Sequence, residues 1–227
     1  MQLQLITTED GSHSLYVPEL KETYHSFHGA LQESVHVFIN RGLTDYLKNI
    51  QKRPIHILEV GLGTGLTALL VADWAAENEV LVSMTSLEAY PIAPALVQEF
   101  NYPDLLDRTV AKEWFNSIHE SRWEKTKEIH SYFQLHKKHI TLEEAVLPTG
   151  EFQIVFFDAF APSKQPELWS KQMLQKVYNS QTDHSYFVTY SAKGQLKRDL
   201  RELNYMVETL DGPPGKKEMV RAIKFKH

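Results

Sequence analysis

The sequence predicts an α/β fold in which helices cover both faces of a doubly wound, mostly parallel sheet. Strand and helix patterns alternate in the centre of the 227-residue chain. The buried strand IHILEV (55–60) precedes a helical pattern at 64–78, and a strand at 80–88 precedes a helix at 93–101. Parallel neighbours need such helical crossovers. At the first strand-to-helix turn, EVGLGTG (59–65) places three glycines where a ligand can lie against bare main chain.

The N-terminal part has a different pattern. Residues 2–17 alternate between apolar and polar side chains around the turn tripeptide Asp10-Gly11-Ser12, which predicts a β-hairpin. Apolar residues at helical spacing then predict one or two helices over 29–50. We expect residues 1–53 to form a hairpin and helical extension that packs on a single globular domain over 54–227.

The second half of the chain continues the sheet. Residues 102–130 are charged and weakly periodic, which indicates an irregular helical insertion. The elements predicted after it are strands at 131–136, 152–158 and 185–191, helices at 170–180 and 193–203, and closing strands at 205–210 and 218–225. The closing strands are separated by DGPPGKK, which is too short for a crossover helix, so they should pair antiparallel. The prediction is a seven-stranded sheet with an antiparallel last strand.

The composition excludes several classes of protein. Cysteine is absent, which excludes disulfides, thiolate zinc sites and a cysteine nucleophile. No run of eighteen apolar residues and no basic-then-apolar leader is present, so we expect a cytoplasmic protein with no membrane contact. The net charge of −5 means that any contact with nucleic acid must come from a local basic patch.

Two classes of ligand suit the glycine turn. A dinucleotide fingerprint needs G-x-G-x-x-G, but its third position here is Leu66, which weakens that interpretation. The ammonium and sulfonium of S-adenosylmethionine tolerate an acid at Glu59, whereas a pyrophosphate is repelled by it. Glu88 closes the second strand and can accept hydrogen bonds from ribose hydroxyls in either class. These residues favour S-adenosylmethionine, and Glu88 does not discriminate.

The stretch FFDAFAPSKQPELW (156–169) follows a buried strand and should lie beside that ligand. Ligands bind beyond the carboxyl ends of parallel strands, so Asp158 should project toward the methyl donor. There it can hold an incoming amine and accept its proton, while Phe160 stacks on a base or excludes water. Lys164 adds a cation to the same loop. The alternative is that Asp158 only caps the following helix and that Phe160 belongs to the core.

Two further clusters are candidates for ligand contact. In ETYHSFHGALQES (22–34), Tyr24, His25 and Ser26 precede a helix, and their spacing favours substrate or cofactor contact over a metal site. Near the C-terminus, cationic residues suggest either a phosphate-contacting rim or an ordinary solvated face. These residues are Lys193, Lys197, Arg198, Lys216, Lys217 and Arg221.

Six stretches carry a resemblance to a known family. They are DGSHSLY (10–16), YHSFHGALQESVHVFI (24–39), LEVGLGTGLTALL (58–70), FFDAFAPSKQPELW (156–169), TYSAKGQLKRDL (189–200) and GKKEM (215–219). Together they resemble, over nearly the whole chain, the methyltransferase unit of bacterial tRNA 5-methylaminomethyl-2-thiouridine biosynthesis enzymes. In the donor loop, Leu62 and Thr67 replace an aromatic residue and an amide that relatives often have.

The resemblance implies a class I, Rossmann-like S-adenosylmethionine-dependent methyltransferase that methylates the primary amine of 5-aminomethyl-2-thiouridine at the tRNA wobble position. The anticodon stem-loop of tRNA would be the partner. Many relatives carry an FAD-dependent oxidase that this chain has no room for, so separate enzymes would supply the aminomethyl uridine. The alternatives are a small-amine N-methyltransferase or spermidine synthase-like transferase, and a noncatalytic module that binds a nucleoside or RNA.

The residues expected to form the site fall into three groups. The catalytic residues would be Asp158 and Phe160. The residues expected at the cofactor are Glu59, Gly61, Gly63, Gly65, Glu88, Tyr24, Ser26 and Asp158. The residues expected at the substrate are Lys164, Tyr190, Lys193, Lys216 and Lys217. No metal ligands are expected.

Overall fold

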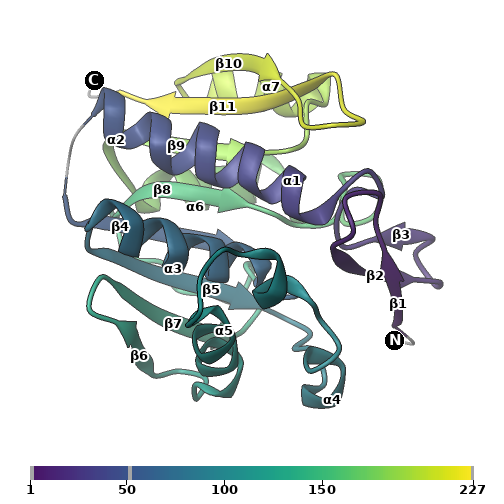
Figure 1. Cartoon of the computed structure of the whole chain (residues 1–227). Coiled ribbons are helices and arrows are strands. Elements are labelled where there is room, and N and C mark those ends of the chain that lie inside the picture. The colour runs from purple at the N-terminus through teal and green to yellow at the C-terminus, as the bar shows by residue number, and fades with distance from the viewer. Residues whose placement is uncertain (1–2, 51–52, 226–227) are drawn as a thin grey trace.

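The computed structural model describes residues 3–50 and 53–225. Within this part of the chain, a central eight-stranded sheet lies between two layers of helices (Figure 1). From one edge to the other, its strands are β10 (Tyr205–Asp211), β11 (Glu218–Lys224), β9 (Gln181–Thr189), β8 (Phe152–Phe157), β4 (Ile55–Val60), β5 (Val82–Glu88), β7 (Phe133–His139) and β6 (Thr126–His130). The chain passes outward from β4 in both directions, and this reversal of strand order opens a crevice at the carboxyl ends of the strands.

The directions of the strands agree with the predicted fold class. Strands β4, β5, β7, β8 and β9 run parallel, and β11 runs antiparallel to both β9 and β10. The predicted antiparallel pairing across DGPPGKK is therefore confirmed. The predicted number of strands is one too few, because β6 adds an antiparallel edge strand beside β7. Its first three residues, Thr126 to Glu128, are exposed, so β6 lacks the apolar pattern by which the other strands were predicted.

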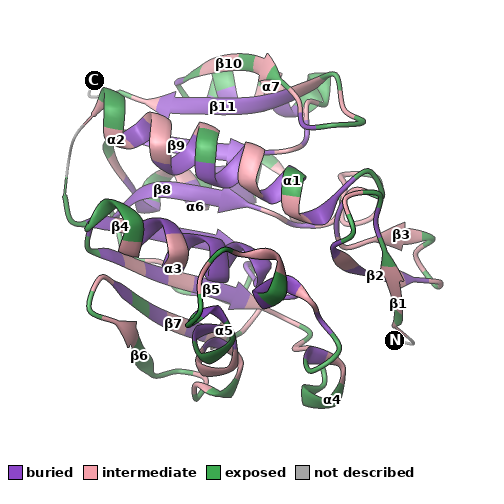
Figure 2. Ribbon diagram, viewed as in Figure 1, coloured by how far each residue is buried: buried purple, intermediate pink, exposed green. Residues whose placement is uncertain are grey.

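The helical layers enclose one apolar core on each face of the sheet. On one face, α3 (Leu66–Asn78) and α5 (Ala111–Glu120) pack beside an N-terminal helix. On the other face, α6 (Lys171–Ser180) and α7 (Gly194–Glu202) cover β8 and β9. Figure 2 shows the resulting burial of the central strands and of the sheet-facing sides of the helices. No helix in the described residues is long and apolar enough to cross a bilayer.

The N-terminal helix is continuous from Ala30 to Asn49. It consists of α1 (Ala30–Ser34), a π-helical segment η1 (Val35–Thr44) and α2 (Asp45–Asn49). The helix predicted over 29–50 is thus confirmed. In the π-helical segment, a Cβ added at Gly42 would lie 2.8 Å from the Phe156 ring, so the missing side chain lets the helix lie directly on β8.

The predicted N-terminal hairpin is also confirmed. Strands β1 (Gln4–Thr7) and β2 (His13–Val17) pair antiparallel, and a short strand, β3 (Glu22–Thr23), extends the pair to a three-stranded sheet. Gln2, where the prediction begins, lies outside the described residues. This small sheet lies beside the N-terminal end of α1, so the segment after β3 approaches the carboxyl edge of the large sheet (Figure 1).

The region between β5 and β7 differs most from the prediction. The helix predicted at 93–101 is a single turn, α4 (Pro94–Val97), followed by a 3₁₀ turn at Tyr102–Leu105. After Val97 the chain continues in tight turns, with Glu99 N donating to the Leu96 carbonyl at 3.1 Å and Phe100 N to the Val97 carbonyl at 3.3 Å. These turns let Phe100 and Tyr102 pack into the core. The expected irregular insertion contains α5, whose buried Trp114 and Phe115 pack into the core.

Candidate active site

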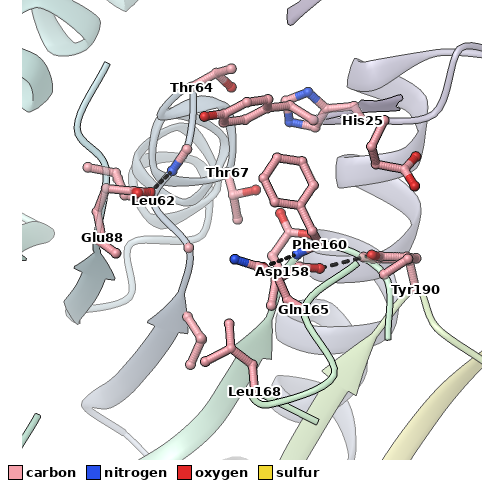
Figure 3. Close-up of a pocket in the computed structure, with 18 of the residues that line it drawn as sticks. His25, Leu62, Thr64, Thr67, Glu88, Asp158, Phe160, Gln165, Leu168 and Tyr190 are labelled. Carbon is pink, nitrogen blue, oxygen red and sulfur yellow. Dashed lines mark hydrogen bonds between the residues drawn. The ribbon is translucent and has the colours of Figure 1, made fainter. Parts of the chain in front are cut away.

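A cavity of about 520 Å³ lies at the carboxyl ends of β4, β5 and β8 (Figure 3). Its walls come from the segment after β3, the first turn of α1, the glycine turn, the segments after β5, β7, β8 and β9, and the loop between β10 and β11. The cavity is therefore at the reversal in strand order, where doubly wound folds bind their ligands.

The glycine turn after β4 forms one wall of this cavity. Gly61, Gly63 and Gly65 have φ angles of +96°, +52° and +75°, a region that other residues rarely adopt. A Cβ at Gly61 would lie 2.9 Å from the Asp158 carbonyl oxygen, and one at Gly65 would lie 2.6 Å from His119 Nε2. Gly61 and Gly63 line the cavity, whereas Gly65 faces His119 behind the turn.

Glu88 at the end of β5 is held in place by main-chain donors. Gly63 N donates to Glu88 Oε2 at 2.8 Å, and Tyr90 N donates to Glu88 Oε1 at 2.8 Å. Each carboxylate oxygen keeps a second lone pair, and Glu88 lines the cavity. An oriented carboxylate of this kind suits a pair of ribose hydroxyls.

Glu59 is fully buried in β4, beside Ser86 of β5 and Phe156 of β8. Neither of its carboxyl oxygens has a hydrogen bond of normal geometry among the described residues. Burial raises the pKa of Glu59 well above its usual value, although the Ser86 hydroxyl favours the ionised form. Glu59 does not line the cavity, so the structure does not bring this predicted cofactor residue to the cavity surface.

Asp158 begins the loop after β8 and lines the cavity. Its N–H donates to the Val60 carbonyl at 3.0 Å, which fixes the loop beside β4. Burial raises the pKa of the Asp158 carboxyl to about 8; the negative charge of Glu33 adds to this shift and Lys216 opposes it. A carboxyl group with a pKa near neutral pH can exchange a proton with an amine.

The loop that carries Phe160 is fixed from several sides. Phe160 N donates to Gln165 Oε1 at 3.0 Å, and Trp169 Nε1 donates to the Phe160 carbonyl at 2.8 Å. Tyr190 donates from its hydroxyl to the Ala159 carbonyl at 2.9 Å (Figure 3). The Phe160 ring is therefore presented to the cavity by a rigid support.

The alternative roles considered for Asp158 and Phe160 do not fit this geometry. Helix α6 begins at Lys171, and its N-cap is Ser170, whose hydroxyl accepts a hydrogen bond from Met173 N. Asp158 is therefore not the cap of that helix. Phe160 lines the cavity rather than belonging to either buried core.

The segment after β3 closes the cavity from above. Tyr24 and Ser26 line it, and the Tyr24 ring packs edge-on against Phe160 with 5.1 Å between ring centres. His25 is buried and its Nδ1 lies 3.1 Å from the Ser14 hydroxyl. Burial lowers the pKa of His25 to about 4, so its imidazole is neutral.

Glu33 is a cavity residue that the sequence prediction missed. It lies in the first turn of α1, is almost fully buried, and accepts a hydrogen bond from Ser26 N at 3.1 Å. It also forms an ion pair with Lys216, whose Nζ lies 4.1 Å from the centre of the Tyr190 ring. An acid in the first turn after ETYHSFHGALQ was the available signal, but such acids are common at helix starts.

Several predicted substrate residues lie outside the cavity. Lys164 donates to the Leu20 carbonyl at 2.7 Å and ties the β8 loop to the turn before β3. Lys193 and Lys217 are exposed and do not line the cavity. Tyr190 and Lys216 do line it. Of the proposed basic rim, Arg221 is engaged in ion pairs with acids of the fold.

The sequence of the chain matches a known protein family. Residues 108–225 match the family model described as S-adenosyl-L-methionine-dependent methyltransferase. The chain belongs to this family. Its cofactor is accordingly S-adenosylmethionine, and the predicted fold class is confirmed. The residues present fit that cofactor: the bare glycine turn suits its amino-acid end, and the oriented Glu88 suits its ribose.

Individual relatives of this methyltransferase have more specific names. The "tRNA 5-methylaminomethyl-2-thiouridine biosynthesis bifunctional protein MnmC" of Burkholderia thailandensis is 28% identical over 237 residues, which is 95% of this chain and 34% of the relative. The protein of the same name from Burkholderia multivorans is 28% identical over 225 residues, 93% of this chain and 33% of the relative. The chain thus spans about a third of the length of these curated relatives.

The fold also matches solved structures. The crystal structure of MNMC2 from Aquifex aeolicus superposes with a TM-score of 0.77 at 22% identity, covering 99% of this chain and 70% of that one. The CurJ carbon methyltransferase superposes with a TM-score of 0.52 at 14% identity, covering 89% and 57%. At these identities the matches support the methyltransferase fold.

Proposed function

We propose that this methyltransferase transfers a methyl group from S-adenosylmethionine to the primary amine of 5-aminomethyl-2-thiouridine at the wobble position of tRNA, which gives 5-methylaminomethyl-2-thiouridine. The observation that carries the proposal is the acceptor end of the cavity, where Asp158 lies beside the Phe160–Tyr24 aromatic pair. The MnmC relatives match this chain almost from end to end, and the acceptor is proposed from the modified uridine in their names.

The cavity residues divide between donor and acceptor. Glu88, Gly61 and Gly63 hold the cofactor, which supplies an electrophilic methyl group on sulfur when bound. Asp158 holds the acceptor amine by hydrogen bond and takes its proton, because only the free lone pair can attack the methyl carbon. Phe160 packs against the base and excludes water from the reacting atoms.

The partners and location follow from this acceptor. The anticodon stem-loop of tRNA covers the mouth of the cavity, with the wobble nucleotide turned into it. An enzyme that generates the aminomethyl group must act before this one, because a primary amine is the substrate. We place the reaction in the cytoplasm, where tRNA is modified.

The test is methyl transfer with purified protein and labelled S-adenosylmethionine. tRNA that carries the aminomethyl group should be labelled, and the same tRNA without that group should not. Equal labelling of both tRNAs contradicts the proposal, as does labelling of free small amines in preference to tRNA. Asp158→Ala should lower turnover by roughly 10²–10⁴-fold while its unfolding transition stays intact.

A further inference from the structure

Glu33 and Lys216 join two distant parts of the chain inside the cavity. Glu33 lies in α1 and Lys216 in the loop between β10 and β11, 183 residues apart in sequence. The side chains of Glu33 and Lys216 keep only 7% and 31% of their exposure. The Lys216 ammonium also lies 4.1 Å from the centre of the Tyr190 ring, and both residues line the cavity. Lys216 is therefore a half-buried cation in the cavity wall.

Both members of this ion pair act on Asp158. All three residues line the cavity. The negative charge of Glu33 makes the Asp158 carboxyl bind its proton more tightly, and the positive charge of Lys216 has the opposite effect. Burial has the largest effect of all.

The other titratable groups around Asp158 leave these two charges dominant. Tyr190, from the segment after β9, has a pKa well above its usual value because of burial, and burial raises the pKa of Tyr24 to about 12. His25 is neutral because burial lowers its pKa to about 4. Glu59 on β4 also interacts with Asp158, and it remains the same in every variant proposed below.

We propose that Glu33 and Lys216, an ion pair in the wall of the cavity that Asp158 also lines, are a positioning pair that prepares Asp158 to take the proton of the acceptor amine. The identity of that amine rests on the proposed function. In the step, one proton moves from the acceptor ammonium to an Asp158 oxygen. The nitrogen lone pair then forms the bond to the donor methyl carbon, and the electron pair of the carbon–sulfur bond remains on sulfur.

The product leaves as a secondary ammonium, and Asp158 returns its proton to water. An efficient base binds its proton with an affinity near the working pH. Glu33 alone would make Asp158 hold its proton too tightly, and Lys216 alone would make it too weak a base. The pair brings the two opposing charges to one place.

The first test measures Asp158 directly, without an acceptor. Carboxyl ¹³C NMR of the full chain follows the titration of Asp158, with its signal assigned by its loss in Asp158→Asn. Lys216→Gln should raise the Asp158 pKa by about one unit, and Glu33→Gln should lower it by about one unit. Lys216→Arg retains the charge and should keep the wild-type value.

An exposed ion pair provides the control that separates this effect from a loss of structure. Lys171→Gln breaks an exposed ion pair with Glu202 that does not line the cavity, and it should leave Asp158 unchanged. A merely structural role of the pair predicts shifts in one direction, or none, for both Glu33→Gln and Lys216→Gln, and that result would overturn the proposal. If one of these two variants fails to fold, the other is compared with Lys216→Arg. Relative to Lys216→Arg, the Asp158 pKa should still be raised in Lys216→Gln or lowered in Glu33→Gln, and an unchanged value would overturn the proposal.

The second test is the pH–rate profile of methyl transfer to aminomethyl-tRNA. Its acidic limb should shift to higher pH in Lys216→Gln and to lower pH in Glu33→Gln, by the same amounts as the Asp158 pKa shifts in the NMR titrations. NMR shifts without a matching shift of the limb would refute the role of Asp158 as proton acceptor. If the wild-type protein methylates no tRNA, the proposed function fails, and the NMR experiment still tests the pair.

Discussion

Gly63 and Glu88 are joined by a 2.8 Å hydrogen bond from the Gly63 N–H to Glu88 Oε2, which connects the glycine turn after β4 to the acid at the end of β5. This bond aligns two parts of the proposed cofactor site before any ligand arrives. Pre-aligned groups lose less entropy on binding, so the site should bind its cofactor without rearranging the turn.

Glu88→Ala should weaken binding of S-adenosylmethionine by about 10–100-fold, because the loss of one hydrogen bond to a charged acceptor costs about 1.5–3 kcal/mol. Isothermal titration calorimetry measures this affinity. Glu202→Ala, which removes an acid from the exposed pair with Lys171, is the matched control and should bind like the wild type. Wild-type affinity in Glu88→Ala would remove Glu88 from the cofactor site.

Gly65→Ala should lower the free energy of unfolding by more than the roughly 1–2 kcal/mol that a left-handed residue costs. The added Cβ also meets His119 Nε2 at 2.6 Å. Gly150→Ala is the control, because Gly150 has φ +63° with nothing within 4 Å of an added Cβ. Urea unfolding should show a larger loss of stability in Gly65→Ala than in Gly150→Ala. Adding His119→Ala to Gly65→Ala should remove only the part of the loss that comes from the steric contact. Equal losses at both glycines would disprove the steric contribution.

Stability should fall as pH rises toward 8, with Asp158 as one cause. Its pKa is raised from 3.8 to about 8 in the folded protein, so the folded state binds more protons than the unfolded state between these values. The stabilisation is complete below pH 3.8 and is lost as pH rises through 8, at up to about 1.4 kcal/mol per pH unit. Urea unfolding from pH 5 to 8 should therefore show a shallower decline for Asp158→Asn than for wild type. Identical slopes would mean that Asp158 is ionised in the folded protein.

Arg221→Met should destabilise the fold without a specific effect on tRNA binding. Arg221 donates to Asp45 Oδ2 at 2.8 Å and to Glu208 Oε2 at 2.6 Å, and it keeps 9% of its side-chain exposure. Because both acids are partly exposed, we expect a loss near the lower end of about 3–5 kcal/mol. Lys171→Met, at an exposed pair, should change the stability far less. A large loss of tRNA affinity with unchanged stability would instead make Arg221 a nucleic-acid contact.

The sequence was most informative where structure is local. The buried runs of β4 and β8 were predicted because parallel strands covered on both faces read as continuous apolar segments. The exposed strand β6 had no such pattern. The ion pair of Glu33 with Lys216 could not be predicted, because no local rule joins residues so far apart in sequence. The roles of the individual site residues, and the division of the chain at residue 53, stay predictions.

The bridge from α1 to the loop after β10 also bears on how the protein is made. The glycine turn and Glu88 leave the ribosome before Lys216 does, whereas the ion pair with Glu33 needs the loop between β10 and β11 in place. A nascent chain can therefore assemble the proposed donor half of its pocket first, and it completes the proposed acceptor half only when the β10–β11 hairpin docks. Methyl transfer would then have to wait for that docking.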